Sequence, residues 1–171
     1  ILGTADPLYK ASSQGGELFV GYADGAFVKL RASNGSVIWK KQLQSNSQKF
    51  RDVDMIPLLD KDRLYVATFG GNLYCLKKKT GHVVWEKPIG SGVSFALYQN
   101  NLIVSNSEGH LLSLDKLTGK EVWKNESLVG SLTKPLVYKD MVVVGSSRGK
   151  IYFVQADLGK VMAGRFARKG I

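Results

Sequence analysis

The sequence predicts an all-β fold built from four β-propeller blades, and three observations lead to this prediction. Four turn glycines recur at steps of 46, 38 and 40 residues, at positions 35, 81, 119 and 159. Each glycine lies between two short strand-like segments, and in the first three repeats a Trp follows the glycine by four residues. No segment of useful length has the periodicity of a helix. A self-similar unit of about 40 residues made of short strands is typical of a propeller blade.

Each repeat supplies four strand-like segments, which we expect to form one four-stranded antiparallel blade. In the first repeat these segments are residues 7–10, 17–22, 26–31 and 36–43. The Asp24–Gly25 pair between two apolar runs is a strong signal for a hairpin. The blades are expected at approximately 5–43, 54–89, 92–125 and 132–166, within one half-domain that covers residues 1–171.

The later repeats follow the same order, and their first strands are expected at 55–59, 93–98 and 134–138. The second strands are almost continuously apolar, which predicts burial on both faces between neighbouring blades. The third strands alternate between apolar and polar residues, as expected for strands that lie farther from the ring axis.

Composition narrows the class of protein without identifying a chemistry. The chain has 171 residues, a formal net charge of +10 and one Cys, which excludes an internal disulfide. A charge of this size favours acidic partners or anionic surfaces. The basic residues are scattered over different repeats and no nucleic-acid module is recognisable, so no nucleic-acid partner is expected. No apolar run approaches a membrane span, and a start at Ile1 without Met or signal peptide indicates a mature or excised piece.

Few residues qualify as chemical candidates. Trp39, Trp85 and Trp123 are expected to join blades, although exposed stacking on a carbohydrate or peptide is the alternative. Cys75 lies in an alternating strand and is expected to pack as a small hydrophobe. His82 and His110 have no second ligand at metal-binding spacing. We therefore expect no catalytic residue, no metal and no cofactor.

The repeats resemble the pyrroloquinoline-quinone type of propeller. Residues 112–123 read Leu-x-Leu-Asp-x-x-Thr-Gly-Lys-x-x-Trp, which is similar to the tryptophan-docking motif of that superfamily. The resemblance implies that the Trp of one blade stacks on the glycine turn of a neighbouring blade. The implied structural set is Trp39, Trp85 and Trp123 with Gly35, Gly81 and Gly119.

Within that superfamily the chain resembles the BamB family, propeller lipoproteins that take part in assembling outer-membrane β-barrel proteins. Residues 51–59 (RDVDMIPLL), 128–145 and 3–7 carry this resemblance. It implies a periplasmic location at the outer membrane, with membrane attachment only through an anchor outside this chain. It also implies that Asp52 and Asp54, with Arg51 beside them, contact the POTRA repeats of a BamA-like partner. At Ile1–Leu2 the chain lacks the Leu-Arg pair of the family.

Three functions remain open from the sequence. The first is a non-enzymatic scaffold of the BamB type, for which partner contact competes with simple capping of the loop backbone by Asp52 and Asp54. The second is a self-assembling propeller-like protein without the BamA-docking role. The third is a fragment of a quinone-dependent dehydrogenase. Because the family is eight-bladed, four blades correspond to half a ring, and we expect a homodimer or higher assembly in which a second chain completes the eight.

Overall fold

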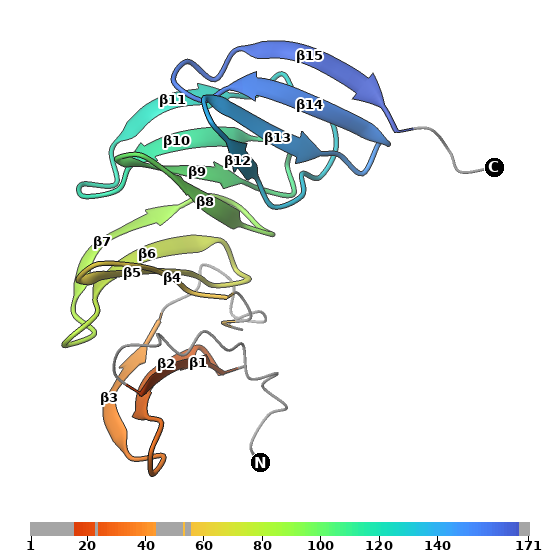
Figure 1. Cartoon of the computed structure of the whole chain (residues 1–171). Coiled ribbons are helices and arrows are strands. Elements are labelled where there is room, and N and C mark those ends of the chain that lie inside the picture. The colour runs from red at the N-terminus through yellow and green to blue at the C-terminus, as the bar shows by residue number, and fades with distance from the viewer. Residues whose placement is uncertain (1–15, 23, 44–52, 54–55, 168–171) are drawn as a thin grey trace. The chain divides into compact units, whose positions relative to one another are not determined.

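The structure is a computed structural model that describes residues 16–22, 24–43, 53 and 56–167. Within these residues every regular element is a β-strand. The strands form four antiparallel sheets, and the chain divides into two compact units, Ile1–Ile89 and Gly90–Ile171, each containing two sheets (Figure 1). The all-β fold predicted from the repeats is thereby confirmed.

The first unit contains sheets of three and four described strands. The three-stranded sheet has the order β1-β2-β3 and consists of β1 (Glu17–Gly21), β2 (Ala26–Arg31) and β3 (Val37–Gln42). The other sheet consists of β4 (Leu58–Asp60), β5 (Arg63–Ala67), β6 (Asn72–Lys77) and β7 (Val83–Pro88). The strand expected at residues 7–10 lies outside the described residues.

The second unit contains two four-stranded sheets with the same simple meander order. One consists of β8 (Ser94–Tyr98), β9 (Asn101–Ser105), β10 (Leu111–Asp115) and β11 (Glu121–Asn125). The other consists of β12 (Leu136–Tyr138), β13 (Met141–Gly145), β14 (Lys150–Gln155) and β15 (Val161–Phe166). Within each sheet, every strand therefore pairs with the next described strand along the chain, as in the blade of a propeller.

Two first strands are shorter than the sequence predicts. The strands expected at 55–59 and 134–138 are observed as β4 and β12, which have three residues each. Pro57 and Pro135 stand immediately before them. Proline has no N–H to donate to a sheet ladder, so pairing starts one residue later. The corresponding β8 has no such proline and has five residues.

A β-bulge recurs at the same place in all four sheets. The register between the third and fourth strands shifts after Lys29, Cys75, Ser113 and Phe153. In each case one residue of the fourth strand is left without a partner. These four residues are apolar and exposed: Ile38, Val84, Val122 and Met162. Because a bulge re-aims the side chain next to it, it sets the direction of the residue that follows, which is Trp in the first three sheets.

The core of each unit lies between its two sheets. In the first unit Phe19 and Phe27 pack with Leu64, Val66 and other residues of the second sheet. In the second unit a corresponding cluster contains Ile103 and Leu111 from one sheet and Val142, Val144, Tyr152 and Val154 from the other. Each such side chain contributes about 1.5–3 kcal/mol when fully buried.

Burial of the strands agrees only partly with the sequence prediction. Of the second strands, β5 and β9 are buried on both faces, as predicted, whereas the prediction is wrong for β1 and β13, which are only partly buried. The third strands β6 and β10 are also buried on both faces up to the last position, although their sequences alternate. Alternation there reflects small polar residues such as Cys75 and Ser113, both of which have 0% of their surface exposed.

Candidate functional site

Trp39 joins the two sheets of the first unit. It lies on β3, and its ring covers Gly81 so closely that an added Cβ would come within 2.8 Å of Trp39 Cε3. Its Nε1–H donates to the carbonyl oxygen of Lys78 at 3.2 Å. Gly81 has φ = 72°, a left-handed conformation that favours glycine. The turn therefore accepts the indole through its backbone alone.

Trp123 makes the same contact in the second unit. An added Cβ on Gly159, where φ = 67°, would overlap the indole at 2.6 Å from Cδ2. Trp123 Nε1–H donates to Ala156 O at 2.9 Å, and Asn125 Nδ2 donates to Gly159 O at 2.6 Å. In both units the accepting carbonyl belongs to the residue three positions before the glycine. We call this arrangement a Trp–Gly dock.

The remaining residues of the predicted docking set are Trp85, Gly119 and Gly35. Trp85 and Gly119 belong to different units, so their docking stays a prediction; within its own sheet the Trp85 ring lies 6.1 Å from the ring of Tyr65. An added Cβ on Gly35 would meet no heavy atom of the described residues within 4 Å. Gly159 was not in the predicted docking set, although its place in the glycine repeat was the signal for it.

Lys29 reinforces the first dock and was missed in the sequence. Its side chain is only 5% exposed, and Nζ lies 2.7 Å from Glu17 Oε1. The same ammonium donates to Lys78 O at 3.3 Å, so this carbonyl accepts from both Lys29 and Trp39. Nζ also lies 5.6 Å from the centre of the Phe19 ring. A lysine in an alternating strand gives no sequence signal for such a buried pair.

The predicted partner-binding residues Arg51, Asp52 and Asp54 lie outside the described residues. Val53, between the two aspartates in sequence, is described and is 4% exposed in the core of the first unit. Its backbone N–H donates to Tyr22 O at 3.2 Å. Val53 is thus held both by its side chain and by its backbone next to the β1–β2 hairpin.

A ladder of serines ties the loops of the second unit together at the ends where its first strands begin. Ser107 N–H and Oγ–H both donate to Ser91 O, at 3.0 and 2.9 Å. Ser131 Oγ donates to Ser107 O at 2.9 Å, and Ser131 N–H donates to Ser147 Oγ at 3.0 Å. Ser91 and Ser131 precede the first strands β8 and β12, and Ser107 and Ser147 follow the second strands β9 and β13. The hydrogen bonds therefore link the loops of both sheets into one polar surface.

The titratable groups offer little chemistry. Burial raises the pKa of the Cys75 thiol, although Arg63 Nη1 donates to its Sγ at 3.7 Å. Burial likewise raises the pKa of Tyr65. His110 lies 3.6 Å from Glu108 and 3.7 Å from Glu126, and His82 is exposed. Over the described ranges there is no group of three or more His, Cys, Asp or Glu arranged to hold a metal ion.

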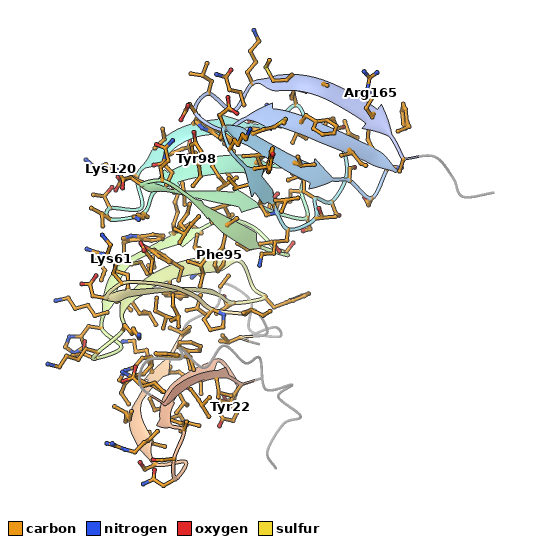
Figure 2. The ribbon with its side chains drawn as sticks, viewed as in Figure 1. Tyr22, Lys61, Phe95, Tyr98, Lys120 and Arg165 are labelled. Atoms are coloured by element: carbon orange, nitrogen blue, oxygen red, sulfur yellow. The ribbon has the colours of Figure 1, made fainter. Side chains whose placement is uncertain are left out.

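Other polar contacts are structural. Tyr98, at the end of β8 (Figure 2), donates its hydroxyl to Asp157 at 3.1 Å and so joins the two sheets of the second unit. In the part of the chain that the structure describes, no helix has the length and apolar character needed to cross a membrane. The features that remain as candidate functional surfaces are loops and sheet faces, which suit protein contacts.

Meander sheets joined by Trp–Gly docks define a β-propeller protein of the pyrroloquinoline-quinone repeat type. Comparison with known proteins agrees with this class. The sequence profile of the family described as "Outer membrane protein assembly factor BamB" matches residues 47–168. The chain therefore belongs to that family.

Individual relatives give the extent of the match. The BamB of Shewanella oneidensis is 31% identical over 166 residues, which are 94% of this chain and 41% of that protein. The crystal structure of BamB from Moraxella catarrhalis has a TM-score of 0.79 and 21% identity, covering 92% of this chain and 49% of that one. A quinohemoprotein alcohol dehydrogenase from Pseudomonas putida has a TM-score of 0.71 at 14% identity, which shows the shared fold alone. The chain thus spans less than half the length of these relatives.

Proposed function

We propose that the chain is a non-enzymatic scaffold that supports the assembly of β-barrel proteins into the outer membrane, acting on the periplasmic side of that membrane. The observation that carries this proposal is the family match over residues 47–168, which includes the Asp-Val-Asp segment. The named relatives are outer membrane protein assembly factors. A rigid set of sheets that presents loops is the physical basis on which such a protein holds partners together.

The proposed docking residues are Asp52 and Asp54, with Arg51 beside them, and the proposed partner is a BamA-like protein with POTRA repeats. Val53 supports this assignment, because its buried side chain and its bond to Tyr22 O give the segment a fixed point on the first sheet. Two carboxylates so close in sequence repel each other unless a cation faces them. A basic group of a partner would supply that cation.

The experiment measures binding of purified POTRA repeats to the Asp52→Ala, Asp54→Ala double variant by surface plasmon resonance. Loss of charge pairs at an interface typically costs 2–5 kcal/mol when they are buried, so we expect the Kd to rise at least about 30-fold. The matched control is Asp60→Ala with Asp62→Ala. This pair has the same spacing and charge, but it lies at the β4–β5 turn, at the other end of β4.

Unchanged binding by the Asp52/Asp54 variant would contradict the docking assignment. Equal weakening by both double variants would also contradict it, because binding would then depend on net charge and not on these two residues. Circular dichroism of each variant establishes that the sheets are intact.

A second proposal is that the chain self-associates as a homodimer or higher assembly. It is favoured by the large apolar side chains that the fourth sheet leaves exposed, including Leu136 at 65% and Tyr138 at 60%. Sheet faces of this kind are stable when another layer covers them.

A further inference from the structure

The outer face of the fourth sheet, β12–β15, carries apolar side chains that are exposed or half-buried. One cross-strand row on this face runs through Leu136, Val143, Phe153 and Ala163. Leu136 is 65% exposed, and the other three are half-buried. β15, an edge strand of this sheet (Figure 1), carries Ala163. The row is therefore apolar from one edge of the sheet to the other.

The third sheet shows what this face does when it is covered. Its equivalent row runs through Ala96, Ile103, Ser113 and Trp123. Ile103 and Ser113 have 0% exposure because the fourth sheet packs on them. The same face of one sheet thus binds the opposite face of the next sheet.

The first sheet offers a matching opposite face. Phe19 and Phe27 point into the core of the first unit, so the alternate residues of β1 lie on the other side of the sheet. Leu18 pairs with Leu30, and Leu30 with Val37. The equivalent residues of the fourth sheet, Val142, Val154 and Val161, are the ones that pack against the third sheet. Val37 is 61% exposed, so this apolar face has room for a partner.

The turn of the first sheet also retains an open receiving position. Gly35 has φ = 70°, close to Gly81 at 72° and Gly159 at 67°, which both receive a Trp. No described heavy atom lies within 4 Å of an added Cβ at Gly35. The fourth sheet, in turn, has Ala163 in the place of Trp, with Phe153 opposite it across the strands. In this cross-strand pair the aromatic ring therefore belongs to the third strand of the sheet, whereas in the other three sheets it belongs to the Trp of the fourth strand.

We propose that the outer face of β12–β15 binds the first sheet of a second copy of this chain, placed as the next blade, with Ala163 next to Gly35 of that copy. This inference rests on the self-association proposed above and names its two faces. The contact repeats the one already made between sheets within each unit, without an indole. Because it is head-to-tail, the contact gives a closed ring if the rotation between copies closes and an open assembly if it does not.

The test restores the missing indole by Ala163→Trp. At this position a Trp would cover Gly35 of the second copy, as Trp123 covers Gly159. We expect the Kd of self-association, measured by sedimentation velocity over a range of concentrations, to fall about 10-fold or more, which corresponds to about 1.4 kcal/mol or more. The emission of the new Trp is expected to shift to shorter wavelength as the protein associates.

A second substitution identifies the receiving turn. Gly35→Ala places a Cβ where the indole would lie and should abolish the gain from Ala163→Trp. The matched control is Gly149→Ala, because Gly149 has φ = 74° and also has no described heavy atom within 4 Å of an added Cβ. This control carries the same backbone strain at the β13–β14 turn and should leave the gain intact.

A third variant tests the face without adding a ring. Leu136→Asp places a charge on the proposed interface and is expected to weaken association at least about 10-fold. Leu117→Asp, at an exposed residue of the β10–β11 turn, should have no such effect. Because both side chains are at least half exposed, the sheets should fold in either variant, which circular dichroism checks.

The outcomes separate this inference from the proposals on which it rests. If the chain associates but Ala163→Trp has no effect, or its gain survives Gly35→Ala, the assignment of faces is overturned and self-association stands. If the chain and its Ala163→Trp variant stay monomeric at all concentrations, both are overturned. Binding of POTRA repeats through Asp52 and Asp54 is a separate measurement that none of these results decides.

Discussion

Gly159→Ala should destabilise the second unit far more than the same substitution at an unoccupied turn. The added Cβ would overlap the six-membered ring of Trp123, lying 2.6 Å from Cδ2 and 2.9 Å from Cζ3. The turn cannot move away easily, because Gly159 N–H donates to Gln155 O at 2.9 Å and Asn125 Nδ2 donates to Gly159 O at 2.6 Å. The indole must therefore leave its place.

The expected cost has three parts. An Ala at φ = 67° is strained by about 1–2 kcal/mol. Displacing the indole loses the bond from Trp123 Nε1–H to Ala156 O, worth about 1 kcal/mol. Partial exposure of a half-buried Trp adds about 1–2 kcal/mol. The sum is about 3–5 kcal/mol, against about 1–2 kcal/mol for Gly149→Ala, where only the backbone strain applies.

Guanidinium denaturation followed by circular dichroism measures these values, and a double-mutant cycle isolates the steric part. In a Trp123→Ala background, Gly159→Ala should cost only the backbone strain, so the two substitutions should be non-additive by about 2–3 kcal/mol. If Gly159→Ala costs the same as Gly149→Ala, or the same with and without Trp123, the Trp–Gly dock is not what holds the two sheets together.

Two further predictions concern the first unit. Lys29→Ala should lower the free energy of unfolding by about 2 kcal/mol, because it leaves the partly exposed Glu17 without its 2.7 Å partner. The control Glu86→Ala, on the exposed part of β7, should change the free energy of unfolding by less than about 0.5 kcal/mol. The unit should also lose stability as pH rises above about 9. Burial raises the pKa of Cys75 and Tyr65 above their ordinary values of 9.0 and 10.0, so the unfolded chain releases these protons at lower pH than the folded chain. In urea titrations, Cys75→Ser should therefore shift the onset of this loss of stability to higher pH.

The repeat determines much of this fold at the level of sequence. Four glycines at a spacing of about 40 residues, the first three followed by Trp, define both the number of sheets and the residues of the Trp39 dock. Gly159 could have been assigned in the same way, because a receiving glycine needs a Trp only in the preceding repeat. The dock is local in its chemistry, a ring over a residue without a side chain, and so it leaves a recognisable pattern.

Other features leave no pattern that one sequence reveals. The bulge before each Trp consists of an unpaired residue, and an apolar Ile38 or Val122 in a strand reads as an ordinary paired position. The burial of Lys29 depends on Glu17 and on the carbonyl of Lys78, which come from other strands. Every residue has a backbone carbonyl, so the sequence does not indicate that the carbonyl of Lys78 accepts hydrogen bonds from two donors.

The Trp–Gly docks hold the sheets together without fixing the side chains of the loops, which matters for the proposed function. In both docks the receiving atoms belong to the backbone, so the turn must keep its glycine but not its other side chains. The turn at Gly81 is preceded by Lys79–Thr80 and the turn at Gly159 by Asp157–Leu158, and each accepts an indole. A fold held in this way leaves its loops free to differ in charge and shape. The sheets can therefore be shared with relatives at 31% identity, and the docking that we propose for Asp52 and Asp54 would then depend on the loops alone.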